Sequence, residues 1–242
     1  MPRQRNAIDA DPSRGRRRLL VAAGAGALLA GCASAQYVPA PYAQTPAPSV
    51  RVGDRWRYAK IDRYSGRQVT ELAMEVVSLE PQLRLRVDDA EGVQHSDEVY
   101  AAPWMALQDP TYDPVAIFLH PTPVVPRQLA VGGAERVSNR WRPPGYERWY
   151  FWSEWIDALG WERIRVPAGE FTALRVMRRI AYEHSDPFRW DNARDETLWY
   201  APEVNRWVLR DTTGTYRWPG DRRGPPLRDD WTILQLLEYR RG

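Results

Sequence analysis

Apolar and charged residues alternate without a break in Leu83-Arg84-Leu85-Arg86-Val87-Asp88. Successive side chains of a β-strand point to opposite faces, so this alternation predicts a strand with one buried and one solvated face. Residues 71–76 show the same alternation just before it, and Glu80-Pro81-Gln82 between the two segments has turn composition. The sequence therefore predicts an antiparallel hairpin over residues 71–88.

The same period of two recurs along much of the remaining chain. The further predicted strands are residues 56–61, 93–100, 148–157, 161–166, 171–184, 197–201 and 207–213. Residues 231–239 are predicted as a last strand, although their cluster of Ile and Leu also fits one face of a helix. We therefore expect an all-β domain over residues 51–242. It is an antiparallel meander that forms a curved sheet or a partly open β-barrel or sandwich.

Residues 101–146 interrupt this regular pattern because prolines are frequent there. Proline cannot donate a hydrogen bond to a central ladder of a sheet. The prolines are Pro103, Pro110, Pro114, Pro121, Pro123, Pro126, Pro143 and Pro144. We expect a long connection with short strands or turns that crosses between two halves of the sheet.

The first 31 residues have the three parts of an export signal. A basic segment ends in Arg16-Arg17-Arg18, an apolar run extends over residues 19–30, and Ala30-Gly31 supplies small residues before Cys32. The apolar run is shorter than the roughly 20 residues of a spanning helix. Leu29-Ala30-Gly31-Cys32 resembles a lipobox, the cleavage and acylation site of bacterial lipoproteins. The resemblance implies that Cys32 becomes the acylated N-terminus, carrying a diacylglyceryl group and an N-acyl chain such as palmitate.

The anchor predicts attachment to the outer membrane, with the domain facing the periplasm. Ala33 and Ser34 follow the cysteine, whereas Asp in that place is the inner-membrane retention signal of enteric bacteria. Arg16-Arg17-Arg18-Leu19-Leu20 also resembles a twin-arginine signal, so general secretory and twin-arginine export both stay open. Residues 32–50 are predicted to be a lipidated terminus and a proline-rich tether, since proline favours an extended chain.

Composition excludes several classes of function. The chain has a net charge of +3, but residues 1–31 carry six arginines and two aspartates, so the mature chain has a net charge of −1. A nucleic-acid-binding surface needs clustered positive charge, so we expect no nucleic-acid partner. Cys32 is the only cysteine, so no disulfide or thiolate metal site is expected, and no cofactor is implied.

Two motifs in the second half resemble a loose group of uncharacterised proteobacterial envelope proteins and lipoproteins. They are Val166-Pro167-Ala168-Gly169-Glu170-Phe171 and Trp199-Tyr200-Ala201-Pro202-Glu203-Val204. The group is expected to form antiparallel, partly open barrels or curved sheets. It has no established activity, so the resemblance implies no catalytic residue. The chain departs from the group after Gly132-Gly133, where the expected aromatic residue is delayed to Trp141.

Catalytic and metal-binding signatures are absent from the sequence. The three histidines are His95, His120 and His184, and none has metal-ligand spacing. His184-Ser185-Asp186 lies in a polar segment with Asp191, Asp195 and Glu196. This segment favours a solvated hairpin loop; the alternative is a hydrolase site that uses Asp186 and Glu196.

Aromatic residues are concentrated in residues 149–161. Alternation predicts Trp149, Phe151 and Trp155 on one face of a strand, and Tyr150 and Trp152 on the other. The simplest interpretation is core packing. The functional alternative is an aromatic-walled groove for an acyl chain or a sugar ring, for which Trp149, Trp152 and Trp155 are the candidate binding residues.

Three functions remain open from the sequence. The first is a non-enzymatic outer-membrane lipoprotein that binds an envelope protein or an apolar ligand such as a lipid. The second is an envelope hydrolase acting on glycan or lipid. The third is a structural or assembly lipoprotein of a larger envelope complex. The lipobox and the missing catalytic signatures favour the first.

Overall fold

A computed structural model describes residues 36–220 and 224–242, and the predicted signal peptide and Cys32 lie outside these ranges. The described residues form strands and turns, and none forms a helix long and apolar enough to cross a bilayer. The strands are β1 (Gln36–Val38), β2 (Arg55–Asp62), β3 (Gln68–Ser78), β4 (Leu83–Asp89), β5 (Glu98–Ala102), β6 (Met105–Asp109), β7 (Ala116–Pro123), β8 (Ala134–Arg142), β9 (Tyr150–Val166), β10 (Gly169–Tyr182), β11 (Trp190–Ala201), β12 (Arg206–Arg217) and β13 (Leu227–Arg240).

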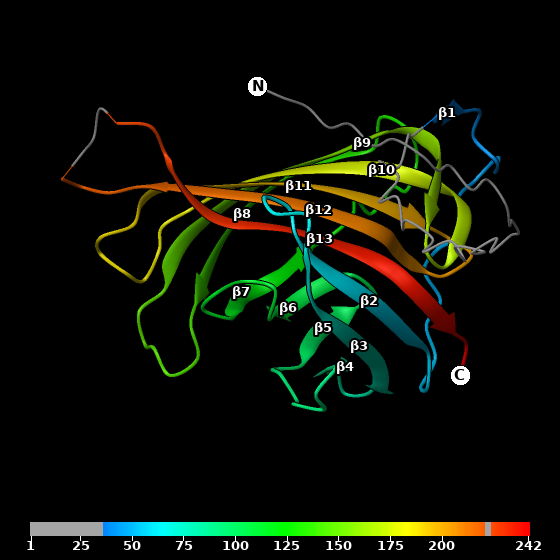
Figure 1. The fold of residues 1–242 in the computed structure, drawn as a ribbon, viewed down its shortest axis with the longest axis horizontal. Coiled ribbons are helices and arrows are strands. Elements are labelled where there is room, and N and C mark those ends of the chain that lie inside the picture. The colour runs from blue at the N-terminus through cyan, green and yellow to red at the C-terminus, as the bar shows by residue number, and fades with distance from the viewer. Residues whose placement is uncertain (1–35, 221–223) are drawn as a thin grey trace, which may run out of the picture. The chain divides into compact units, whose positions relative to one another are not determined.

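The strands form one antiparallel meander that closes into a barrel. Strands β2 to β13 each pair with the next in the sequence, except that β13 also pairs with β2. The twelve strands make a closed ring, and β1 adds to β9 as a thirteenth strand (Figure 1). The all-β antiparallel prediction for this domain is confirmed. The barrel is closed rather than partly open, because β13 bonds to β2 and β8 bonds to β9 over their whole common length.

The structure corrects the interpretation of residues 101–146 as a long connection. Strands β6, β7 and β8 lie in this region and complete the barrel wall. Pro121 and Pro123 are tolerated in β7 because β8 pairs with this strand only at Ile117 and Phe118. Beyond those residues β7 has a sheet neighbour on one side, which leaves room for residues that cannot donate a hydrogen bond.

Other boundaries also shift. The strand predicted at 93–100 begins at Glu98, and the strands predicted at 148–157 and 161–166 are one strand, β9, with an irregularity at Leu159. There Val176 pairs with Ala158 and Arg175 pairs with Gly160, so Leu159 is an extra residue. The last element, β13, is a strand and not a helix, because it bonds to β12 and β2 along its length.

The barrel has two ends that differ in what they carry. We call one the terminal end, because it holds Gly242, the start of β2 and the segment from β1 to β2, at the right in Figure 1. Its turns are residues 79–82, 103–104, 124–133, 167–168 and 202–205. The opposite, distal end holds residues 63–67, 90–97, 110–115, 143–149 and 183–189.

The segment predicted as a tether contacts the barrel where the structure describes it. β1 pairs with residues Trp161–Arg163 of β9, along the same edge that β8 occupies further toward the distal end. The rings of Tyr42 and Trp161 lie 5.7 Å apart, and the backbone N–H of Ser49 donates to Asn205 Oδ1 at 3.0 Å. Residues 36–50 therefore run along the terminal end rather than standing free of the domain.

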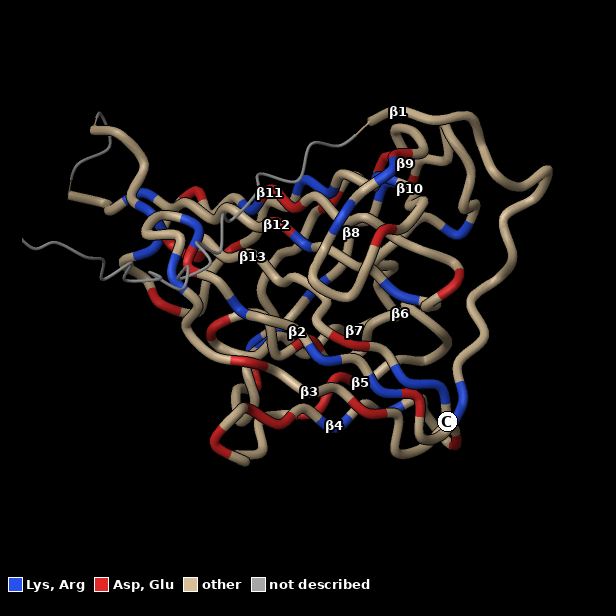
Figure 2. Tube along the Cα trace, turned by 45° about the vertical axis from the view of Figure 1, so that its right-hand side comes forward, with Lys and Arg blue, Asp and Glu red and all other residues tan. Residues whose placement is uncertain are grey.

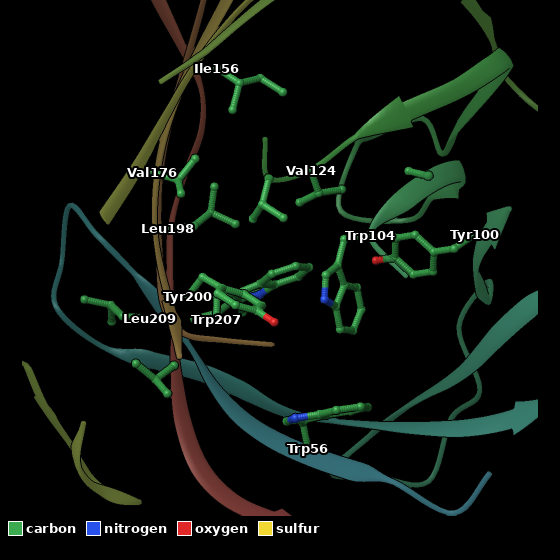
Figure 3. Packing of buried hydrophobic residues seen from close by; sticks show 14 of the residues in the cluster. Trp56, Tyr100, Trp104, Val124, Ile156, Val176, Leu198, Tyr200, Trp207 and Leu209 are labelled. Carbon is green, nitrogen blue, oxygen red and sulfur yellow. The ribbon is translucent and has the colours of Figure 1, made fainter. Parts of the chain in front are cut away.

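Aromatic rings fill the interior near the terminal end (Figure 3). Trp104 lies 6.1 Å from Trp56, 5.4 Å from Tyr100 and 5.4 Å from Trp207, measured between ring centroids. The Arg206 guanidinium lies over Trp207 at 4.1 Å and bonds both carboxylate oxygens of Glu98 at 2.9 and 2.7 Å. Rings packed edge to face and a paired cation thus fill this part of the interior.

We expect Trp104→Ala to destabilise the protein strongly, because Trp104 is 1% exposed and touches three other rings of this cluster. Truncation of a buried tryptophan costs about 3–5 kcal/mol. Chemical denaturation monitored by circular dichroism measures the loss. Trp218→Ala is the control, since Trp218 is 50% exposed and its removal should change the free energy of unfolding by less than about 1 kcal/mol. Equal losses would contradict the packing described.

Candidate ligand cavity

A cavity of about 330 Å³ lies inside the barrel toward the distal end. Its walls come from β2, β3 and β4 on one side and from β11, β12 and β13 on the other. The loops at residues 89–96 and 110–115 border it. Exposed residues of the first of these loops, including His95 and Glu91, mark its mouth.

Strand alternation selects the side chains that line the cavity. On β2, Trp56 and Tyr58 face the core, so Lys60 also points inward, and it pairs with Leu234 of β13 and Thr70 of β3. Cross-strand partners point to the same face of a sheet. The apolar part of the lining consists of Val69, Leu72, Met74, Val87, Val115 and Leu234. Hydroxyls of Thr70, Thr212 and Thr232 and the Lys60 ammonium add polar groups.

The deep side of the cavity meets a buried ionic network centred on Glu196. Its carboxylate accepts hydrogen bonds from Arg178 Nη1 at 2.6 Å, Arg194 Nε at 2.6 Å and Arg210 Nη2 at 2.7 Å. Arg178 also donates from Nε to Glu154 Oε1 at 2.8 Å. All five side chains are at most 4% exposed, so the charges are held by one another and not by solvent.

This environment shifts the pKa values of the two buried glutamates in opposite directions. Burial by itself raises the pKa of Glu196, but Arg210, Arg178 and Arg194 outweigh it and hold that pKa far below its usual range. Burial also raises the pKa of Glu154, and its two partners, Arg178 and the indole N–H of Trp152 at 3.1 Å, do not fully compensate. The arginines therefore stabilise the anionic form of Glu196, whereas Glu154 is the network's more easily protonated member.

The network also positions the distal loop at residues 110–115. Arg194 Nη1 donates to the carbonyl oxygen of Thr111 at 3.2 Å, and Arg210 Nη2 donates to Thr111 Oγ1 at 3.1 Å. Arg194 further pairs with Asp230 at 3.0 Å beside the cavity. Among the described residues, Nε of Arg210 has no hydrogen-bond partner although it is buried. Two of the cavity-lining cations thus hold both its floor and part of its rim.

The structure separates the three tryptophans that were candidates for one groove. Trp152 is fully buried inside the barrel, with its ring 4.9 Å from Phe118 and 5.2 Å from Tyr112. Trp155 lies on the outer face of the same strand and is 39% exposed. Trp149 precedes β9, and the Arg142 guanidinium covers its ring at 4.6 Å. None of the three lines the cavity.

The polar segment after His184 divides between a turn and the ionic network. The backbone N–H of Asp186 donates to His184 Nδ1 at 2.9 Å, and Asp186 Oδ1 accepts from the N–H of Phe188 at 2.8 Å. Asp186 is exposed, as the loop interpretation expects. Glu196 lies on β11 and is buried among three arginines, so it does not belong to a solvated loop. No cluster of three metal-binding side chains exists within the described residues.

Sequence analysis named Glu196 in another role and missed the other four residues of the ionic network, although their positions carried a signal. Arg194 and Glu196 alternate in phase with Leu198 and Tyr200, which are buried. Arg178 is likewise in phase with Val176 and Ile180. A charge in phase with the apolar side of a strand is a candidate for burial. Which charges meet across the barrel depends on its closure.

The chain was also compared with known proteins. No family model and no curated protein matches it. A "putative lipoprotein" from Parabacteroides distasonis ATCC 8503 is 13% identical, with a TM-score of 0.46 over 80% of this chain and 97% of that one. A "putative exported protein with YmcC-like fold" from Bacteroides fragilis NCTC 9343 is 12% identical, with a TM-score of 0.45 over 79% and 97%. The function therefore has to be argued from this chain's own residues.

We expect Glu196→Gln to destabilise the protein by about 3–5 kcal/mol, because it leaves buried arginines without their shared anion. Urea denaturation measures the change. The control is Asp195→Asn, which alters the neighbouring residue on the outer, exposed face of β11 and should change stability little. If Glu196→Gln matched this control, the network would not stabilise the fold.

His184 should make stability dependent on pH. Burial and the nearby positive charge of Arg189 lower the pKa of His184 in the folded protein, whereas in the unfolded chain it is about 6.5. The free energy of unfolding is therefore unaffected by this group above pH about 6.5. It decreases as the pH falls below that value, because His184 of the unfolded chain binds a proton first. Denaturation at several pH values between about 5 and 8 should show a smaller loss in His184→Gln. Identical slopes for both proteins would contradict this.

Proposed function

We propose that this chain is a lipid-anchored outer-membrane protein whose barrel binds an apolar or amphiphilic ligand, without chemistry on it. The observation that carries the proposal is the cavity of about 330 Å³ between an apolar wall and a charged floor. Ligand pockets range over about 300–1,000 Å³ and combine apolar walls with a few placed polar groups.

The volume limits the size of the ligand. At roughly 30 Å³ per atom, the share of a water molecule in the liquid, the cavity holds on the order of eleven non-hydrogen atoms. A medium-length acyl chain with a small polar head has this size. Leu72, Val87 and Leu234 would contact its chain, while the threonine hydroxyls and Lys60 would meet its head. Within the described residues, Lys60 has no ion pair or side-chain hydrogen bond.

The chain that follows the proposed anchor joins the barrel at the end opposite to the cavity mouth. Gln36 bonds to β9 near the terminal end, and only three residues lie between it and Cys32. An extended chain spans at most about 3.6 Å per residue, so acylated Cys32 lies within about 14 Å of Gln36. The mouth at residues 89–96 is at the distal end. A ligand would therefore enter from the end away from the attachment point.

The position of Glu196 supports binding over the hydrolase version that uses this segment. A general acid or base must exchange a proton near the working pH. Three guanidinium groups stabilise the Glu196 anion, and Asp186 lies in an exposed turn outside the cavity lining. These two carboxylates do not form the convergent pair that acid–base hydrolysis requires.

Native mass spectrometry of the mature protein, released from detergent in the gas phase, tests the proposal. We expect additional masses of a small amphiphile, beyond the covalent acyl chains, and uptake of added decanoate or decanol. Thr70→Trp should abolish uptake by filling the cavity near its mouth. Val77→Trp is the control on the same strand, since Val77 lies outside the cavity and is 38% exposed.

Three results would overturn this proposal or a part of it. Equal uptake by both variants would place the bound amphiphile elsewhere. A protein that takes up neither probe but co-purifies stoichiometrically with other envelope proteins would favour the assembly role. A cysteine without acyl mass would remove the anchor.

A further inference from the structure

The outer face of β9 carries a row of exposed apolar side chains. Phe151, Trp155 and Leu159 recur every four residues and are 52%, 39% and 38% exposed. Phe151 and Trp155 are an even number of residues apart and share one face of the strand. Leu159, the extra residue at the irregularity, is exposed next along the strand. Tyr37 of β1 extends the row and is 65% exposed. Its ring packs against Gly160: a Cβ atom added to Gly160 would lie 2.9 Å from Cε1 of Tyr37. We call these four side chains the β9 row.

Arginines flank the β9 row on both neighbouring strands. Arg136 of β8 and Arg179 of β10 are the direct cross-strand partners of Trp155, and Arg140 of β8 is the partner of Phe151. Lysine and arginine positions are blue in Figure 2, which shows such positions along β8 and near β9 and β10. All three are exposed, and none forms an ion pair within the described part of the chain. The carboxylates that share this outer face are Asp157 on β9, Asp195 on β11 and Glu162 on β9. Glu162 is buried and paired with Arg175 at 3.2 Å. The face is thus apolar along its centre and has a small excess of unpaired positive charge.

The chain that follows Cys32 joins the barrel beside this face. β1 pairs with β9 at Trp161–Arg163, and Cys32 lies four residues before Gln36. Leu159 is four residues from Arg163, the partner of Gln36, which is about 13 Å along a strand. The β9 row therefore begins beside the point where the chain leaves the barrel toward Cys32, and it runs from there along the same strand.

We propose that the outer face of β8, β9 and β10 rests on the surface of the bilayer that holds Cys32. The proposal depends on acylation of Cys32, which belongs to the proposed function. Tryptophan and tyrosine favour the boundary between headgroups and acyl chains. Arginine can bury its stem there while its guanidinium pairs with lipid phosphates. The acyl chains hold the protein at the membrane, and the β9 row sets which side of the barrel faces it.

This orientation has a consequence for the cavity. In the ring of twelve strands, five strands separate β9 from β3 by either route, so β3 is on the opposite side of the barrel. β3 and its neighbours β2 and β4 form one wall of the cavity. With β9 on the bilayer, this wall and the loop at residues 89–96 face the periplasm. The contact with membrane and the access to the cavity do not compete.

Lipid quenching of a fluorophore tests the orientation in the mature acylated protein. Acylation leaves Cys32 without a free thiol, so Leu159→Cys and Val77→Cys each provide one labelling site, and both positions are 38% exposed. The protein carries an environment-sensitive fluorophore and is reconstituted in phosphatidylethanolamine–phosphatidylglycerol vesicles with brominated acyl chains. We expect at least threefold stronger quenching at position 159 than at position 77. Phe151→Ser with Trp155→Ser should reduce the difference while leaving the unfolding midpoint close to that of the parent.

Each other outcome overturns the proposal in a recognisable way. Equal quenching at both positions, in protein that still floats with the vesicles, contradicts the orientation but leaves the anchor in place. Protein that stays in the aqueous fraction contradicts the anchor and with it the proposed function. A label at position 159 that lipid does not quench, but that is shielded from aqueous iodide only in isolated outer membranes, indicates a protein partner instead.

Discussion

The pairing of β8 with β9 is the constraint on which the other features depend. Eight consecutive residue pairs, from Ala134–Asp157 to Trp141–Tyr150, join these strands after the chain has followed the ring from β2 through β8. Without this ladder, β8 and the first half of β9 would be open edges, and unpaired edges expose backbone groups. Closure also encloses the space in which Glu196 and its arginines exclude water.

The number of strands explains why long aromatic and arginine side chains fill the interior of the barrel. An eight-stranded barrel is just wide enough for side chains to fill, and the interior widens with each added strand. Twelve strands leave a lumen that aliphatic residues alone span poorly. Long side chains bridge it instead: Arg206 reaches between Trp56, Trp104 and Trp207, and Arg178 reaches from Glu154 to Glu196. The cavity at the distal end is the part of the lumen that these side chains do not reach.

The features that could be predicted from the sequence are those that depend on local interactions. Alternation at residues 83–88, and at Trp152 and Trp155, gave the fold class and the correct inward and outward faces, because the period of a strand is a local property. Residues 101–146 were expected to be a connection with short strands or turns, and their three strands were not recognised as part of the barrel wall. Prolines oppose pairing unless one side of the strand is free, and only the three-dimensional structure shows that side. Glu196 was interpreted as a loop carboxylate because its three arginine partners lie on three different strands. Only the folded barrel brings them together. Cys32 can be assigned only from its sequence context.

Both faces of strand β9 carry side chains with a structural or proposed functional role, and the sequence alternates between the two sets. Its inner side chains, Trp152 and Glu154, belong to the core and the ionic network. Its outer side chains form the β9 row, and its second half receives β1 and therefore the chain from Cys32. Because these tasks fall on alternate residues of one strand, a change of one residue in its register would place the apolar row inside and Glu154 outside. The register of β9 thus fixes the core and the exposed face together, and the eight pairs with β8 hold that register.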